Sequence, residues 1–97
     1  MPTYETLPRF TTDLDRLTPE QRRRFRRTVA AFVEDLRAGG RFRPGLRIKG
    51  VRCAPGVYEL TWAPDGRATW RYGRAVVAGE QHIVWRRIGG HDIFTGP

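Results

Sequence analysis

The chain has 97 residues and carries 18 lysines and arginines against 10 aspartates and glutamates, a formal net charge of +8. A chain of this length holds one small hydrophobic core, so we expect a single domain over residues 1–97. No apolar run approaches the roughly 20 residues that a membrane span needs, and the N-terminal segment lacks the pattern of a signal peptide. The one cysteine, Cys53, can form neither an internal disulfide nor a zinc site, and we expect a cytoplasmic protein without membrane contact.

The excess of positive charge is the first functional signal. Seventeen of the 18 basic residues are arginines, and Lys49 is the only lysine. GC-rich coding is one explanation of this ratio. Coding bias does not explain the excess of basic over acidic residues. This excess is spread along the chain, because residues 1–45 hold 10 basic and 6 acidic residues and residues 46–97 hold 8 and 4. Such an excess is typical of a protein that binds a polyanion, and nucleic acid is the leading candidate. Arginine suits phosphate because its guanidinium donates two hydrogen bonds at once.

The N-terminal half predicts a short strand and two helices. Residues 3–7 alternate as in a short strand. The first helix presents one apolar face, made of Phe10, Leu14 and Leu17. A longer helix begins after Thr18, because Thr18 and Gln21 have the spacing of a capping box and Pro19 suits the first turn. Gly39 ends this helix. Its apolar stripe consists of Phe25, Val29, Phe32, Val33 and Leu36.

Basic residues cover the side of the long helix away from this stripe. They are Arg22, Arg23, Arg26 and Arg27. Charged outer faces are the norm for amphipathic helices, so a solvated face is one interpretation. A docking face for a large polyanion is the other.

The C-terminal half predicts strands. Residues 57–62, 68–72 and 82–88 are rich in β-branched and aromatic side chains, and 47–51 forms a shorter segment. The turn signal at 64–66 joins the first two of these strands as a hairpin. We therefore predict a two-layer α+β fold with the order β-α-α-β-β-β. In it, the helical pair packs on one face of a small antiparallel sheet and the other face stays open.

Strand alternation assigns side chains to the two faces of this sheet. Toward the helices it places Tyr58, Leu60, Trp62, Trp70 and Tyr72. On the open face it places Glu59, Thr61, Thr69 and Arg71. In the last strand, Ile88 should face the helices, which sends Arg87 outward and Arg86 inward. Because an inward arginine is costly, we expect a β-bulge or a snorkelling side chain at Arg86.

The open face also collects basic residues beside a histidine. The basic residues are Arg47, Lys49, Arg52, Arg71 and Arg87. His91 follows the last strand. This combination fits cleavage of RNA, which carries its own nucleophile, the 2′-OH. The protein must remove one proton, donate another and stabilise charge on the phosphate. His91 suits either proton step, Glu59 suits the base, and Arg71 and Arg87 suit the phosphate.

Other chemistry finds no support in the sequence. Two histidines without a His/Cys spacing motif predict no metal site, and neither a P-loop nor a dinucleotide fingerprint occurs, so we expect no cofactor. Plainer roles for the same residues stay open. His91 fits a polar loop position, and Glu59 fits an ion pair with Arg71 across the hairpin.

The tail IGGHDIF (88–94) is similar to the C-terminal motif of the YafQ-like and HigB-like branch of the RelE/ParE superfamily of toxin–antitoxin toxins. The resemblance covers about residues 3–95 and includes RIKG (47–50), VYELTW (57–62) and WRYG (70–73). It implies a RelE-like fold and an mRNA interferase that enters the ribosomal A site and cuts mRNA without a metal. It also implies a cognate antitoxin protein as partner.

The resemblance implies roles for particular residues. His91 matches the catalytic histidine of the tail, and Phe94 matches the aromatic residue that closes the motif, one spacer residue short. The family's basic positions ahead of the hairpin and in the last strand correspond to Arg47, Lys49 and Arg87. Thr69 stands where many ribosome-dependent members carry an arginine, and Arg71 on the same face is the expected substitute.

Three functions are therefore compared below. The first is a ribosome-associated endoribonuclease toxin with His91, Glu59, Arg71 and Arg87 in its catalytic site. Its expected RNA contacts are Arg22, Arg23, Arg26, Arg47, Lys49, Arg52 and Phe94. The second is a ParE-like toxin of the same fold that inhibits DNA gyrase without catalysis. The third is a non-catalytic RNA-binding domain, for which charge alone suffices.

Overall fold

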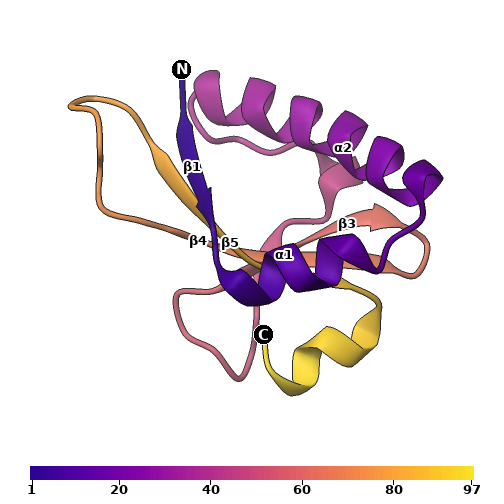
Figure 1. Ribbon diagram of the computed structural model, residues 1–97. Coiled ribbons are helices and arrows are strands. Elements are labelled where there is room, and N and C mark those ends of the chain that lie inside the picture. The colour runs from indigo at the N-terminus through magenta and orange to yellow at the C-terminus, as the bar shows by residue number, and fades with distance from the viewer.

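The computed structural model describes all residues, 1–97 (Figure 1). In chain order the elements are β1 (Thr3–Thr6), α1 (Pro8–Asp15), α2 (Pro19–Arg37), the 3₁₀ turn η1 (Pro44–Leu46), β2 (Lys49–Gly50), β3 (Tyr58–Ala63), β4 (Gly66–Tyr72), β5 (His82–Gly89) and the 3₁₀ turn η2 (His91–Thr95). Figure 1 shows α2 on one side of the sheet and η2 on the other. The predicted α+β class and its helix-on-sheet layering are confirmed. Neither helix combines the length and apolar character needed to cross a membrane.

The sheet is mixed rather than purely antiparallel, which corrects the prediction. Its strand order is β1-β5-β4-β3-β2. Strands β2 to β5 pair antiparallel as expected, but β1 pairs parallel with β5, with Thr3 opposite His82 and Thr6 opposite Trp85. The two helices between β1 and the meander form the long crossover that a parallel pairing requires.

The capping box that begins α2 is confirmed. The Oγ1 of Thr18 accepts a hydrogen bond from the amide of Gln21 at 3.1 Å, and Gln21 Oε1 accepts from the amide of Thr18 at 2.8 Å. Each bond satisfies an amide that the first helical turn leaves without an intrahelical partner. The cap therefore sets where α2 starts and, with it, which helix face meets the sheet.

Replacing Thr18 by alanine is expected to lower the free energy of unfolding by about 1 kcal/mol, since it removes the N-cap acceptor. Chemical denaturation measures the change. Thr28→Ala is the matched control, because the Thr28 hydroxyl bonds only to the Arg24 carbonyl within the helix. A Thr18→Ala variant as stable as the control would contradict this role for the cap.

The core between α2 and the sheet is largely aromatic. Phe32 lies at the centre, with its ring 4.9 Å from that of Trp70 and 5.4 Å from that of Trp85. Phe25 packs edge-on against Trp62 and Trp85. All three tryptophans belong to this core. Strand alternation predicts this for Trp62 and Trp70, whereas Trp85 reaches the core only because of an irregularity in β5. They are therefore not available on the surface to stack on bases.

A β-bulge in β5 resolves the parity conflict at Arg86. Thr69 pairs with Arg87 and the next residue, Trp70, pairs with Trp85, so Arg86 has no partner in the ladder. The extra residue lets Trp85 and Ile88 both face the core. Arg86 is on the open face, where its Nε and the hydroxyl of Thr69 both donate to the carbonyl of Pro97.

Helix α1 closes the edge of β5 beyond the end of β1. Asp13 of α1 is buried, and its carboxylate accepts hydrogen bonds from the guanidinium of Arg87 at 2.6 and 3.1 Å. It also accepts the backbone amide of Ile88 at 3.2 Å. A side chain here replaces the strand that would otherwise satisfy this amide. Asp13 thus fixes α1 to the sheet and also determines the position of Arg87.

Candidate nucleic-acid site on the open sheet face

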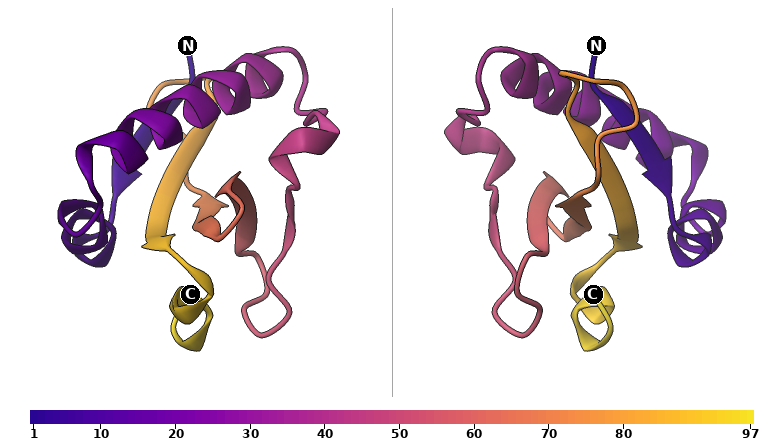
Figure 2. Two further views of the ribbon diagram at one scale, coloured as in Figure 1. Left: turned by 90° about the vertical axis from the view of Figure 1, so that its right-hand side faces the viewer. Right: turned by 90° about the vertical axis from the view of Figure 1, so that its left-hand side faces the viewer.

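Two segments project from the sheet on the side away from α2. They are the connection between β2 and β3, residues 51–57, and the C-terminal turn η2 (Figure 2). Val51, Val57 and Ile93 in these segments are buried, so both are fixed to the sheet by their own apolar contacts. The open face of the sheet thus has a rim on two sides. It is not open throughout, which corrects the prediction, because Thr69 is fully buried and its hydroxyl donates to the carbonyl of Pro97 in the C-terminal segment.

A buried carboxylate lies on this face. Glu59 of β3 has a side chain that is 12% exposed, and its Oε1 lies 3.6 Å from the Nζ of Lys49 on β2. Lys49 is opposite Glu59 in the ladder, and Thr69 is opposite on the other side. The alternative pairing of Glu59 with Arg71 is wrong, because Arg71 is two residues past the cross-strand partner of Glu59. Burying a carboxylate is costly unless a cation compensates it, and Lys49 supplies that cation.

Glu59 and Lys49 line a pocket of about 360 Å³ on the open face. Its other lining residues are Pro44, Arg47, Ile48, Thr61 and Arg67. Arg47 follows η1 in the left-handed conformation, with φ of 51°. Arg67 is anchored, since its Nη1 donates to three carbonyl groups of the β3–β4 turn. The pocket thus combines one carboxylate with three cationic side chains.

His91 lies at the end of the same face. It is exposed as the first residue of η2, and its ring centroid is 6.1 Å from that of Phe94. Gly89, two residues earlier, is opposite Arg67 in the ladder. His91 therefore stands at the β3–β4 turn end of the sheet. The Lys49–Glu59–Thr69 row lies two residues further along the strands than the Arg67–Gly89 pair.

The remaining predicted residues of the open face have other surroundings. Arg71 is half-buried on β4 and donates to the carbonyl of Tyr72 at 3.3 Å. Arg52 is exposed on the 51–57 rim. Arg87 is bound by Asp13 and donates to the carbonyl of Gly96 at 3.0 Å. The hydrogen bond to Asp13 raises the pKa of Arg87 above its ordinary value. The structure thus holds Arg87 apart from the pocket of Glu59.

Two of the three predicted RNA contacts on α2 have partners within the protein. Arg22 donates to the carbonyls of Leu14 and Leu17, where it caps the end of α1. Arg23 pairs with Glu20 at 2.8 Å on the helix surface. Arg26 has no partner and lines an apolar groove beside β1. Arg24 and Arg27, which also lack a hydrogen-bond or ion-pair partner, line a different groove, between α2 and β3.

Arg67 is not among the site residues predicted from the sequence, although its strand parity was a usable signal. Arg67 has the same strand parity as Thr69 and Arg71, but the strand was predicted to begin one residue later, at Ala68. The second histidine, His82, is structural. It is buried, and its ring nitrogens lie 2.8 Å from Thr3 Oγ1 and from Glu5 Oε1, which tie β1 to β5.

No group of three or more metal-binding side chains comes together in the structure. The absence of a metal requirement remains a prediction.

Comparison with known proteins gives a consistent result at the level of the fold. No protein-family model and no curated protein matches the sequence. Among solved structures, YafQ from E. coli strain BL21(DE3) superposes with a TM-score of 0.64 at 11% identity, covering 99% of this chain and 100% of that one. RelE in the RelB–RelE complex from Methanococcus jannaschii gives 0.58 at 17% identity, covering 93% of each chain. The YoeB/ParE toxin from Agrobacterium tumefaciens gives 0.56 at 13%, covering 92% and 98%. The chain has the fold of RelE/ParE-superfamily toxins.

Proposed function

We propose that this protein is the toxin of a toxin–antitoxin pair and that it cleaves RNA on the open face of its sheet. One observation carries the proposal: a buried carboxylate, Glu59, shares a pocket with three cations on a face that also presents an exposed histidine. Each component of metal-independent RNA cleavage therefore has a candidate on one surface. The RelE-like fold adds support, because the solved neighbours are toxins.

In the proposed reaction Glu59 is the general base and His91 the general acid. The Glu59 carboxylate takes the proton of the 2′-OH, whose oxygen attacks the adjacent phosphorus. The bond from phosphorus to the 5′-oxygen breaks, and His91 in its protonated form donates a proton to that oxygen. The products are a 2′,3′-cyclic phosphate and a 5′-hydroxyl. No water, metal ion or further reactant is consumed.

The cations of the pocket stabilise the charge that develops on the phosphate. Lys49, Arg47 and Arg67 line the pocket with Glu59, so they are the groups we place against the phosphate. Arg71 lies further along β4 and contacts a neighbouring part of the RNA. Arg87 holds η2 and α1 through Gly96 and Asp13, which makes it a positioning residue here.

Glu59→Gln is expected to slow cleavage by about 10²- to 10⁴-fold, because the amide cannot accept the 2′-OH proton. The amide has nearly the same shape, so RNA affinity should change little. Single-turnover cleavage and anisotropy measure the two effects separately. A Glu59→Gln variant that cleaves at the original rate would remove Glu59 from the mechanism.

An antitoxin is the expected protein partner. The neighbours include a DinJ–YafQ complex from E. coli and a RelB–RelE complex, each a toxin solved with its antitoxin. A chain with this fold and a net charge of +8 suits an acidic antitoxin segment that folds as it binds. Ribosome-bound mRNA is the proposed substrate.

Induced expression in a bacterial host tests the proposed function against its alternatives. We expect growth arrest together with new 5′ ends in cellular mRNA, mapped by primer extension. Intact transcripts accompanied by DNA breaks would instead establish gyrase inhibition. RNA binding with intact transcripts and intact DNA would establish a non-catalytic RNA-binding domain.

A further inference from the structure

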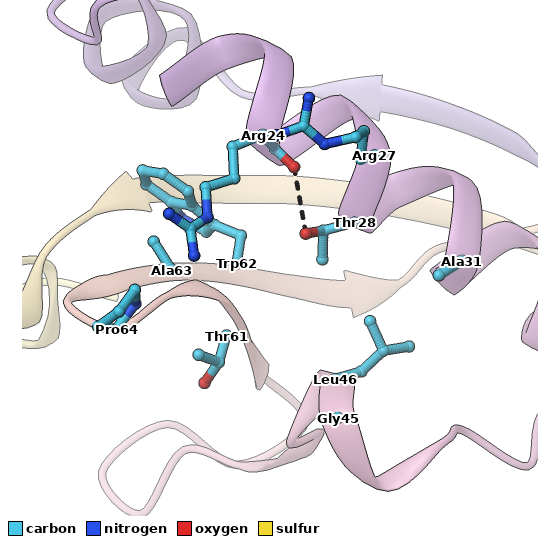
Figure 3. A pocket seen from close by; sticks show the side chains of 10 residues that line it. All are labelled: Arg24, Arg27, Thr28, Ala31, Gly45, Leu46, Thr61, Trp62, Ala63 and Pro64. Atoms are coloured by element: carbon cyan, nitrogen blue, oxygen red, sulfur yellow. Dashed lines mark hydrogen bonds between the residues drawn. The ribbon is translucent and has the colours of Figure 1, made fainter. Parts of the chain in front are cut away.

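A second groove lies beside the proposed active site, between α2 and the C-terminal half of β3 (Figure 3). It has a volume of about 560 Å³. Its polar lining comes from Arg24, Arg27, Thr28 and Thr61. Its apolar lining includes Ala31, Leu46, Trp62 and Pro64. In Figure 3 the side chain of Arg24 extends from the helix toward Trp62 and Ala63 of β3.

The two arginines of this groove form no hydrogen bond or close ion pair with an acidic side chain. Neither the guanidinium of Arg24 nor that of Arg27 forms a hydrogen bond or ion pair within the protein, and both side chains are exposed. On the same helix Arg22 and Arg23 are occupied by protein groups. Since Arg24 and Arg27 are three residues apart, they are neighbours on one helix face. Both lie close enough to Glu20 on this helix to help lower the pKa of its carboxyl, but Glu20 forms its ion pair with Arg23. The groove therefore presents two guanidinium groups that are free to contact an anion.

The groove continues into the proposed active site. Thr61 lines both this groove and the pocket of Glu59. The continuity arises because β2 pairs only with Tyr58 and Glu59, which leaves the outer edge of β3 without a strand partner from Thr61 onward. A chain lying in the pocket of Glu59 can thus pass over the edge of β3 without leaving the protein surface.

We propose that single-stranded RNA follows this route, so that its backbone leaves the pocket over Thr61 and is held in the groove by Arg24 and Arg27. The proposal rests on the proposed function, because the pocket of Glu59 supplies the RNA. Arginine forks fit phosphate oxygens, and the apolar floor suits sugars and base faces. An acidic peptide would meet the same charges, but continuity with the pocket favours the RNA.

The test compares the double variant Arg24→Ala/Arg27→Ala with the control Arg37→Ala/Arg41→Ala, which removes the same charge from exposed arginines outside the groove. The probes are fluorescent 2′-O-methyl RNAs of about 4 and about 12 nucleotides, within the range of known single-strand site sizes. These RNAs cannot be cleaved, so anisotropy reports binding alone. Titrations are repeated over a range of NaCl concentrations.

We expect the double variant to bind the longer RNA about tenfold more weakly, with a salt slope smaller by about 1.4, since each phosphate contact on a single strand contributes about 0.7. Its affinity for the short RNA should equal that of the original protein. Equal weakening by the control variant, or equal weakening for both RNA lengths, would overturn the proposal. So would a poly-glutamate peptide that binds through Arg24 and Arg27 without displacing the longer RNA.

The binding assay separates failure of this proposal from failure of the proposed function. If the original protein cuts no RNA but binding of the longer RNA still requires Arg24 and Arg27, the proposed RNA path is supported and the proposed nuclease activity is wrong. If the original protein cuts RNA and the double variant binds both probes with unchanged affinity, the proposed RNA path is wrong and the proposed nuclease activity is supported.

Discussion

Replacing His91 by alanine is expected to lower the rate of RNA cleavage by about 10²- to 10⁴-fold, the contribution of a positioned general acid. The 5′-oxygen would then leave as an unprotonated alkoxide. His91 is exposed and its side chain forms no hydrogen bond within the protein, so the melting temperature should stay within about 2–4 °C, as for surface substitutions in a chain of this size. Single-turnover cleavage and calorimetry measure the two properties.

The second histidine is the natural control for this experiment. His82→Ala removes the contacts to Thr3 and Glu5 that hold β1 on the sheet, so it should lower stability and leave the cleavage rate of the folded protein nearly unchanged. The two histidines thus give opposite results in the two assays. Full cleavage by the His91→Ala variant would contradict the assignment of the acid.

Asp13→Asn is expected to lower the free energy of unfolding by about 3–5 kcal/mol, the usual cost of breaking a buried ion pair by removing one partner. Arg87 would be left with an uncompensated charge at a side chain that is 13% exposed. Urea denaturation measures the loss. Asp15→Asn, an exposed change at the end of the same helix, should be nearly neutral.

The loss of stability caused by Asp13→Asn should also depend on pH. Burial opposes ionisation of Asp13, but the hydrogen bonds from Arg87 and the Ile88 amide outweigh it, and its pKa lies below the ordinary value of 3.8. A lowered pKa contributes stability above pH 3.8 that is lost as the pH falls through the lowered value. The difference between Asp13→Asn and the original protein should therefore shrink toward low pH. A difference that stays constant from neutral pH to about pH 2 would show that the charge of Asp13 is not its source.

Local sequence signals account for most elements of the fold. The capping box at Thr18 and the apolar stripe from Phe25 to Leu36 act within a few turns of one helix, and both were correct. Strand parity placed Glu59 on the open face and showed a conflict at Arg86, for which a bulge was one of two predicted solutions. These features depend on residues that are close together in the sequence, so they can be predicted from it.

Partners that come together only in the tertiary structure could not be predicted. The parallel pairing of β1 with β5 joins residues almost 80 positions apart. Arg87 meets Asp13 because α1 closes the sheet edge, and no sequence pattern links the two. Parity identified the face that Glu59 occupies, but the register decided that its neighbour is Lys49 rather than Arg71.

Cleavage of RNA with a single 2′-deoxyribose tests the central claim most directly. The substitution is made at the nucleotide on the 5′ side of a mapped cut, and the reaction is run with ribosomes present. If the 2′-OH is the nucleophile on the Glu59 face, this bond should stay intact while neighbouring cuts continue and leave cyclic phosphates. Cleavage of the deoxy-substituted bond at the original rate, with a 5′-phosphate on the product, would contradict the mechanism.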